Sequence, residues 1–245
     1  MAASTETTVA PTSLPRRSFI YRELERAGAR FVAIGDGAVA AGFRQTPAQE
    51  VAAARKLAIV DLSPLPRTGF KGPGAADWLR GRKLKIGDES NCAWPCGKGS
   101  LAARLAPGEV LILGSIDGSD RLWERLDSAW TRDGATCWPV PRRESSFWFM
   151  VTGEQAPKMF AKVCGVDLRP RSFAVHRIAQ TSVARTNCIV IRADVGETLA
   201  YHVLGDSASA GYLWGCLLDA MDEFVAGPVG LDALSSLAGS AARGK

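Results

Sequence analysis

The chain has 245 residues, of which 47% are hydrophobic and 22% are charged, and its formal net charge is +5. This composition is ordinary for a water-soluble globular protein, and the length suits one domain or two small ones with a substantial core. No apolar run approaches the ~20 residues that a membrane-spanning helix needs, so the sequence excludes a helical membrane protein and predicts no membrane partner.

Residues 1–16 lack the basic region and the following apolar stretch of a secretory signal, so we expect a flexible N-terminal tail. Phe19–Ala27 then has a helical pattern, and Phe31–Ile34 is typical of a strand that ends at a Gly-Asp-Gly turn. Thr46 followed by Pro47 is the arrangement of a helix N-cap and a first helical residue, which predicts a second helix from this point.

A short pattern built around a glycine occurs twice in the chain. "GFKGPGAADWL" runs from Gly69 to Leu79, and "VTGEQAPKMF" runs from Val151 to Phe160. In both, an apolar segment leads into a glycine and then into a short helical pattern. The matched pairs are Gly72 with Gly153, Ala75 with Ala156, Trp78 with Met159, and Leu79 with Phe160. The recurrence indicates two copies of one folding unit.

The elements that follow these glycines recur in the same order. In the first half, Ser100–Gly114 predicts a two-stranded hairpin, and Asp120–Trp130 carries apolar residues at helical spacing. In the second half, the corresponding elements are strands at Asn187–Arg192 and Thr198–Gly205 and a helix at Ser209–Phe224. Chance explains one repeated glycine better than it explains several elements in matching order, so we infer an internal duplication.

Each half is led by one further strand, which we expect within Ile59–Phe70 in the first half and at Ser145–Gly153 in the second, with an additional strand at Ala135–Val140. The order strand, helix, strand, strand, helix is typical of a split β-α-β, ferredoxin-like unit. Two such units predict an α+β fold with antiparallel sheets and helices on one face. The predicted organisation is a domain at 17–228 with repeats at about 58–130 and 135–224, and a C-terminal tail at 229–245.

The basic residues are scattered except for the run "RGRKLK" at Arg80–Lys85. This run fits either a solvated helix end or a surface that docks an acidic partner. A nucleic-acid-binding surface would need a longer basic stripe with interleaved aromatic residues, so we predict no nucleic-acid partner. Trp94, Trp138 and Trp148 fall in loop or strand-edge settings, where an exposed tryptophan can anchor a protein interface.

The six cysteines and two histidines form no recognisable catalytic or metal-binding motif. Cys92 and Cys96 are close in sequence, but a zinc site needs two further ligands, and we predict no metal site. The other cysteines lie in apolar contexts typical of buried thiols in a reducing compartment, so we expect a cytoplasmic protein. His202 lies mid-strand, where a histidine is either satisfied within the structure or catalytic. No catalytic triad is visible, and we predict no catalytic residue.

Polar residues at the ends of predicted strands are the remaining candidates for a binding site. Asp61 follows the apolar strand "LAIV", and a carboxylate there can hold a substrate amine or cap a turn. Arg185 and Thr186 precede the second hairpin. An arginine that enters a strand can face the phosphate or carboxylate of a partner, or it can form a surface ion pair.

The motifs, taken in order, resemble a known family. "AIVDLSPLPRTGFKGPGAADWL" is similar to the opening motif of the folate-binding one-carbon transferases of the glycine-cleavage T-protein type. "SLAARLAPGEVLILG", "VDLRPRSFAVHRIAQTSVARTNCIVIR" and "GYLWGCLLDAMDEF" are similar to one branch of that superfamily, the gamma subunit of heterotetrameric sarcosine oxidase. The resemblance runs from about Ala58 to Phe224 and implies a T-protein-like folate-binding fold of two intertwined ferredoxin-like units.

The resemblance also implies candidate cofactor-binding residues. In the transferases, an aspartate and a Tyr-x-Gly-Glu segment after Arg-Thr-Gly contact the pterin or the amine. Arg185 and Thr186 match this motif, but Asn187–Val190 replaces the rest of it, and the strand "SLAARL" has no acidic residue where the aspartate is expected. Asp61 and Arg67 lie in the matched opening motif. The candidates are therefore Asp61, Arg67, Arg185 and Thr186.

The departures from the transferase motif favour a subunit that has kept the fold and lost the transferase site. Such a subunit binds no cofactor alone. Larger flavoprotein subunits of the same complex hold FAD or FMN, and tetrahydrofolate, where present, also belongs to the complex. The resemblance implies that the complex oxidises a secondary or tertiary N-methyl amine by oxidative demethylation. The alternative is a stand-alone tetrahydrofolate-binding protein similar to the one-carbon transferases.

Overall fold

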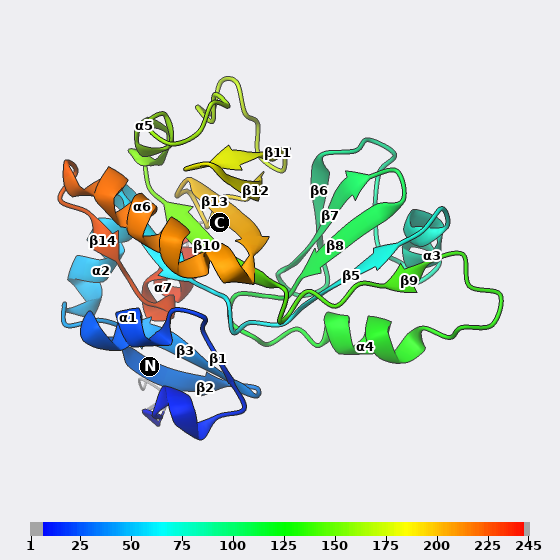
Figure 1. The fold of residues 1–245 in the computed structure, drawn as a ribbon, viewed down its shortest axis with the longest axis horizontal. Helices are drawn as coiled ribbons and strands as arrows, with labels where there is room; N and C mark the ends of the chain where they lie inside the picture. Colours follow the sequence, from blue (N-terminus) through cyan, green and yellow to red (C-terminus); the bar gives the residue numbers. More distant parts are fainter. Residues whose placement is uncertain (1–6, 243–245) are drawn as a thin grey trace.

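The computed structural model describes residues 7–242 and arranges them around three β-sheets (Figure 1). The first sheet belongs to the N-terminal part of the chain. A 3-10 turn at Pro11–Ser13 precedes β1 (Arg16–Arg17), α1 (Tyr21–Arg26), β2 (Arg30–Ile34) and β3 (Gly37–Gly42). The central strand β3 pairs in parallel with β1 and antiparallel with β2. A further helix, α2 (Pro47–Lys56), begins at the predicted N-cap, where the Thr46 side chain accepts a hydrogen bond from Gln49 N.

The described part of the expected N-terminal tail is ordered against this sheet. Thr8 forms an antiparallel bridge with Val32, and Arg16 pairs with Gly37. Residues 7–16 are therefore not a tail, because both ends of this segment are held by backbone hydrogen bonds, from Val9 N to Phe31 O and from Arg16 N to Asp36 O. Residues 1–6 lie outside the described part of the chain.

The second and third sheets contain the two predicted repeats. The five-stranded sheet has the order β6-β7-β8-β5-β9, and the six-stranded sheet has the order β11-β12-β13-β10-β4-β14. The elements of the first repeat are β5 (Arg67–Lys71), α3 (Ala75–Arg80), β6 (Cys92–Cys96), β7 (Ser100–Ala106), β8 (Glu109–Leu113) and α4 (Leu122–Ala129), and the short strand β9 (Trp138–Pro139) joins the same sheet. The elements of the second repeat are β10 (Ser146–Thr152), α5 (Ala156–Phe160), β11 (Ile178–Val183), β12 (Thr186–Arg192), β13 (Ala200–Asp206), a 3-10 turn (Ser207–Ser209), α6 (Ala210–Asp222) and β14 (Gly227–Pro228).

The internal duplication is confirmed by the strand order. The run β5-β8-β7-β6 in one sheet corresponds to β10-β13-β12-β11 in the other, with antiparallel pairing throughout both runs. Helix α3 begins at Ala75 and α5 begins at Ala156, the two positions that the sequence comparison paired. The α+β fold class and its ferredoxin-like repeats were therefore predicted correctly.

The two repeats exchange strands, and this exchange is what makes them intertwined. Strand β4 (Ala58–Asp61) directly precedes the first repeat but pairs with β10 of the second. Strand β9 directly precedes the second repeat but pairs with β5 of the first. The single leading strand expected within Ile59–Phe70 is thus two strands in different sheets. Prolines at 64 and 66 lie in the connection between them, where the missing N–H groups of proline oppose a continuous strand.

The layers of the molecule follow from which strand faces are apolar. Phe70 and Leu79 belong to a core between the five-stranded sheet and α3 and α4, and Phe149 and Leu217 belong to a core between the six-stranded sheet and α6. A third core lies between the two sheets. Each repeat sheet is therefore covered on both faces, which accounts for strands such as β10 in which every residue is buried.

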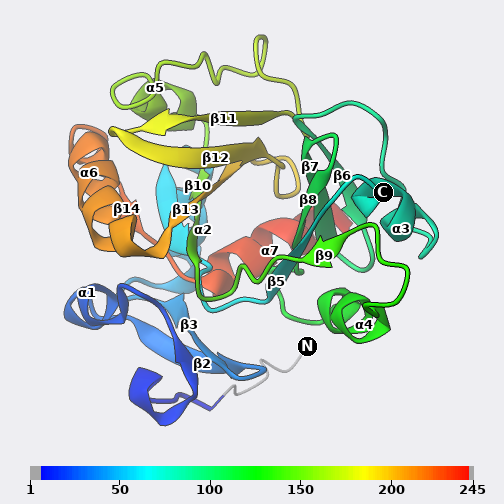
Figure 2. The ribbon, with the colours of Figure 1, turned by 45° about the vertical axis from the view of Figure 1, so that its right-hand side comes forward.

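The segment expected as a C-terminal tail contains a packed helix. Helix α7 (Leu231–Ala242) packs against α2 and β3 and is drawn as the red helix in Figure 2. Its residues Leu234 and Leu237 belong to the core between the sheets. The expectation rested on the many Ser, Ala and Gly residues of this segment. Small residues also permit close packing, and leucines three residues apart give the helix one apolar face.

The buried carboxylate of Glu50 fastens α7 to the rest of the fold. Its Oε1 accepts the Phe43 N–H at 2.6 Å and its Oε2 accepts the Gly230 N–H at 2.7 Å, with 3% of the residue exposed. Glu50→Ala leaves one buried and one part-buried donor without this partner, so we expect the free energy of unfolding in urea to fall by roughly 2–4 kcal/mol. Arg55→Ala, at an exposed position of the same helix, should change it by less than about 0.5 kcal/mol. Equal losses in the two variants would contradict this role for Glu50.

Candidate functional site

A cavity of about 420 Å³ lies where the two repeat sheets face each other. Leu101 and Leu113 line it from β7 and β8 of the first repeat, and Met150 and His202 line it from β10 and β13 of the second. The loop at 193–196 and the exposed side of α7 complete its wall. We call it the seam cavity, because its walls come from both repeats and from the C-terminal helix.

His202, which lines the seam cavity, belongs to a polar pair that is almost completely buried. Trp148 is 0% exposed and His202 is 6% exposed, and the indole Nε1 donates a hydrogen bond to His202 Nδ1 at 2.9 Å. In the neutral ring, the proton must therefore reside on Nε2. Burial lowers the pKa of His202 to about 4, so the ring is uncharged at neutral pH.

The Nε2–H group of His202 is the polar group that this pair can offer to a ligand. It has no hydrogen-bond partner within the described residues, and the side chain lines the seam cavity. A neutral, fixed donor of this kind suits recognition of a carbonyl or ring-nitrogen acceptor. The lowered pKa suits it less for taking up a proton as a general base.

Most other polar groups around the cavity are engaged within the chain. Ser100 Oγ donates to Asp120 at 2.7 Å, and Ser115 Oγ accepts the Asp120 N–H at 3.0 Å. Asp194 forms an ion pair with Arg192 at 2.8 Å. Within residues 7–242, no group of three or more His, Cys, Asp or Glu side chains is placed to hold a metal ion. The cavity therefore has binding character rather than an evident set of reacting groups.

The four residues suggested by sequence lie in two separate places. Asp61 and Arg67 are buried together at the ends of β4 and β5. Arg185 is an exposed residue with φ 64 in the turn between β11 and β12, and Thr186 is the first residue of β12. None of the four lines the seam cavity.

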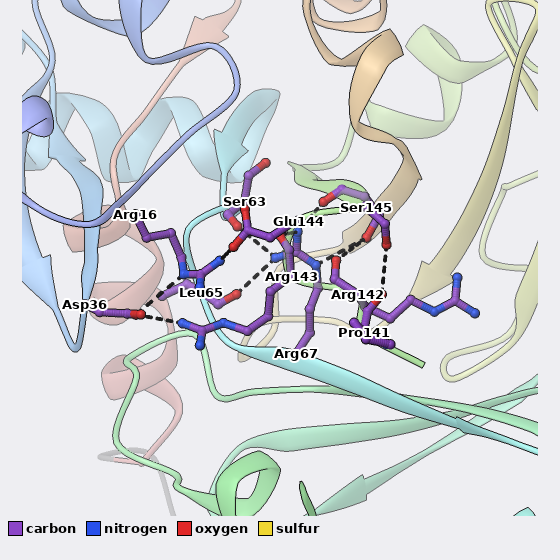
Figure 3. Close-up of polar contacts among 11 residues, drawn as sticks. Arg16, Asp36, Ser63, Leu65, Arg67, Pro141, Arg142, Arg143, Glu144 and Ser145 are labelled. Atoms are coloured by element: carbon purple, nitrogen blue, oxygen red, sulfur yellow. Dashed lines mark hydrogen bonds and ion pairs between the residues drawn. The ribbon is translucent and has the colours of Figure 1, made fainter. Parts of the chain in front are cut away.

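The guanidinium of Arg67 joins the two connections that carry the chain from one sheet to the other (Figure 3). Nη1 donates to the carbonyl oxygens of Ser63 and Leu65 at 2.8 and 3.0 Å, on the connection from β4 to β5. Nη2 donates to the carbonyl oxygen of Arg143, on the connection from β9 to β10, and to that of Ser146, the first residue of β10, and Nε donates to Ser146 Oγ at 3.3 Å. All five donors of the guanidinium are used within the chain.

The charge of Arg67 is held in a dry environment. The residue is 1% exposed, and burial lowers its pKa to about 9, although the nearby Asp61 carboxylate acts in the opposite direction. The pKa of Asp61 is raised by burial, with smaller opposing effects from Ser18, Ser63 and Arg67. Asp61 Oδ1 accepts the Ser63 N–H at 3.1 Å, which is the turn-capping arrangement that the sequence allowed.

Sequence reasoning missed the Trp148–His202 pair. Trp148 was expected in a loop or at a strand edge, but it lies in the middle of β10 with both neighbouring strands paired. Trp148 pairs with Leu204, and Met150 pairs with His202, so the two rings are diagonal neighbours on one face of the sheet. The apolar run around Trp148 was the available signal, since a strand buried on both faces is apolar at successive positions.

The lowered pKa of His202 predicts a specific pH dependence of stability. As pH falls below 6.5, the unfolded chain takes up a proton at this histidine, but the folded chain does not until about pH 4. Folding stability from this group is therefore complete above pH 6.5 and falls by about 3 kcal/mol between pH 6.5 and 4. The free energy of unfolding, measured in urea at several pH values in this range, should depend less steeply on pH in His202→Gln than in the wild type. His176→Asn should keep most of the wild-type pH dependence. An unchanged slope in His202→Gln would contradict the assignment.

The chain was compared with protein families, with curated proteins and with solved structures. The family model of the GCVT N-terminal domain matches residues 20–240. No curated protein matches the chain significantly by sequence. Within the described residues, no helix is long and apolar enough to cross a membrane.

Two solved structures have a similar fold. The first is the glycine cleavage system aminomethyltransferase T from Bartonella henselae, with 17% sequence identity and a TM-score of 0.70. The alignment covers 91% of this chain and 62% of the transferase, so the chain spans less than two thirds of that protein. The second is a chain of the heterotetrameric sarcosine oxidase from Corynebacterium sp. U-96 in complex with pyrrole 2-carboxylate, with 21% identity and a TM-score of 0.59. That alignment covers 74% of this chain and 96% of the other.

The family model covers well over half of the chain, and the fold agrees with that of the aminomethyltransferase. The resemblance predicted from the sequence motifs is thereby confirmed at the level of the superfamily. The chain belongs to the GCVT N-terminal domain family.

Proposed function

We propose that this chain is an accessory, gamma-type subunit of a heteromeric flavin-dependent oxidase or dehydrogenase that demethylates N-methyl amines of the sarcosine class. The observation that carries the proposal is the fold match to the heterotetrameric sarcosine oxidase, in which the aligned part of this chain corresponds to 96% of the matched oxidase chain. The match to the aminomethyltransferase corresponds to 62% of that protein.

The chemistry of the candidate residues supports the same proposal. Asp61 caps a turn through Oδ1 and is 3% exposed, and Arg67 uses all its donors within the chain and is 1% exposed, so neither side chain is accessible to a pterin or an amine at the surface. Arg185 and Thr186 lie apart from them at a hairpin turn. In this account the chain holds no cofactor alone, and FAD or FMN belongs to larger subunits in the cytoplasm. Six free cysteines in the described residues suit a reducing compartment.

A genetic experiment tests the proposal. Removing this chain from its source organism should lower the N-methyl amine-dependent reduction of an electron acceptor in the lysate, because the flavoprotein subunits lose a partner. Returning the wild-type chain should restore the activity. An unchanged rate, measured with sarcosine and with a tertiary N-methyl amine, would contradict the subunit assignment.

The seam cavity favours a second candidate function, a stand-alone tetrahydrofolate-binding protein. Its neutral Nε2–H donor at His202 fits a heteroaromatic ligand with acceptor atoms. Calorimetric titration of the isolated chain with tetrahydrofolate distinguishes the two functions. Binding that His202→Gln weakens would favour this candidate, and the absence of binding heat would favour the subunit.

A further inference from the structure

A second hollow, of about 450 Å³, lies on the first repeat and differs in character from the seam cavity. It is bordered by the loop that follows α3, by the turn between β6 and β7, and by the start of α4. Arg82, Lys83, Lys85 and Arg125 line it, and none of its lining residues is acidic. We call it the basic groove.

The positive charge of the basic groove is largely uncompensated. In the described part of the chain, Lys83 and Lys85 are exposed and form no ion pair. Arg125 is 62% exposed, and its one carboxylate partner there is Asp120 at 3.5 Å. Asp120 is itself 3% exposed and accepts hydrogen bonds from Lys98 N and Ser100 Oγ. Asp120 therefore compensates Arg125, and the cations of the groove that have no carboxylate partner in the described part of the chain are Arg82, Lys83 and Lys85.

This arrangement separates the roles within the basic run of the sequence. Arg80 is neutralised by ion pairs with Asp77 and Asp88. Arg82 stacks 3.5 Å from the Trp78 ring centroid and donates to the carbonyl oxygens of Trp78 and Ala129, both at 3.1 Å. The lysines have neither kind of contact. In this run, Arg80 is in ion pairs, Arg82 is held by stacking and hydrogen bonds, and Lys83 and Lys85 have no ion pair within the described residues.

The walls of the groove are held in place, which reduces the ordering cost of binding. The stacked Arg82 fixes one wall. The opposite wall is the turn at Gly97, where an added Cβ would lie 1.9 Å from Asp120 Oδ2, so the turn sits directly on the buried carboxylate. With these walls fixed, ordering on binding is confined to the exposed side chains of the groove, and a preorganised backbone lowers the cost of binding.

We propose that the basic groove docks an acidic segment of a partner subunit; this rests on the proposed function. Charge complementarity selects the acidic side chains, with Lys83, Lys85 and Arg125 as their counterparts. Leu84, Pro95 and Leu122 provide apolar contacts for a neighbouring side chain of the same segment. An inorganic anion would contact only the charged side chains and would leave the apolar ones unused. A nucleic acid would require a basic stripe longer than these four cations, together with aromatic side chains for base stacking.

The first test uses the isolated chain and does not depend on a complex. A fluorescein-labelled peptide of Glu-Glu-Leu repeats is titrated by anisotropy at roughly 50 and 300 mM NaCl, beside a Lys-Lys-Leu peptide and a short single-stranded DNA. We expect only the acidic peptide to bind, more weakly at high salt. The double variant Lys83→Glu and Lys85→Glu should weaken binding about tenfold or more. Tighter binding of the DNA, or no binding of the acidic peptide, would overturn the proposal.

A matched control distinguishes an effect of the groove lysines on peptide affinity from an effect of the protein's net charge. Lys158→Glu with Arg171→Glu reverses two exposed cations of the second repeat and changes the total charge equally. This pair should keep the acidic-peptide affinity within about twofold of wild type. Equal weakening by the two double variants would mean that overall charge, and not the groove, governs binding.

The second test uses the native complex. Carbodiimide joins a lysine amine to a carboxylate in contact with it, so mass spectrometry should find Lys83 or Lys85 linked to Asp or Glu of a flavoprotein subunit. An assembled complex without such links, and unaffected by the groove double variant, would reject the groove and leave the proposed function intact. If no flavoprotein assembles with the chain, the proposed function fails, and the peptide titration alone decides whether the groove binds acidic segments.

Discussion

Arg67→Ala is expected to lower the free energy of unfolding by roughly 3–5 kcal/mol. The substitution removes a guanidinium whose five donors satisfy buried oxygens of both connections between the sheets. It also removes the positive charge beside the buried Asp61. The residue is 1% exposed, so these hydrogen bonds are made away from bulk solvent. Urea unfolding monitored by tryptophan fluorescence measures the loss.

Arg67→Lys and Arg171→Ala are the matched controls for this prediction. Lysine keeps the charge but has three donors and no planar fork, so it should recover only part of the lost stability. Arg171 is exposed, and its replacement should cost less than about 0.5 kcal/mol. If Arg67→Ala were as stable as Arg171→Ala, Arg67 would not be the link between the crossing connections.

Gly153→Ala is expected to destabilise the protein by about 2–4 kcal/mol, and Gly72→Ala by a similar amount. Gly153 has φ 105, and an added Cβ would lie 2.5 Å from the backbone C and O of Lys56. Gly72 has φ 143, and its Cβ would lie 2.5 Å from the carbonyl oxygen of Thr136. Each glycine is thus in close contact with the backbone just before an exchanged strand. Gly153 contacts the segment before β4, and Gly72 contacts the segment before β9. Chemical denaturation of the two variants measures the expected losses.

Gly165→Ala provides the comparison for the two crossing glycines. An added Cβ at Gly165 meets no atom within 4 Å, and its φ is not in the positive range. This substitution should leave stability within about 0.5 kcal/mol of wild type or raise it slightly. Gly153→Ala with stability equal to Gly165→Ala would contradict the close backbone crossing on which the intertwined arrangement depends.

The repeated unit could be predicted from sequence because its signals are local. Gly72 and Gly153 mark the same turn, and the hairpins and amphipathic helices after them have short-range patterns. The strand exchange could not be predicted this way. Ala58–Asp61 and Arg67–Lys71 are both apolar enough for buried strands, but which sheet each one joins is decided by long-range packing. Helix α7 was missed for a related reason, since its leucines are stabilised by α2 and β3.

The candidate site shows the same division between local and long-range information. Asp61 and Arg67 are near in sequence, and the matched motif suggested them as cofactor-binding residues, but the structure buries them together and Arg67 has partners in a distant segment at Ser146. The pairing of Trp148 with His202 joins strands far apart in the chain. In the sequence alone, Trp148 is consistent with a residue of the hydrophobic core, and His202 is consistent with a structural histidine within a strand. Only the antiparallel register of β10 and β13 brings them together beside a cavity.

The most direct test of the proposed function is to capture this chain with a tag from its source organism under gentle conditions. The visible spectrum of the captured material is recorded, and every chain in it is identified by mass spectrometry. The account predicts larger flavoprotein chains in fixed proportion to this one, with flavin absorbance that sarcosine or a related N-methyl amine bleaches. A colourless preparation that contains this chain alone would contradict it.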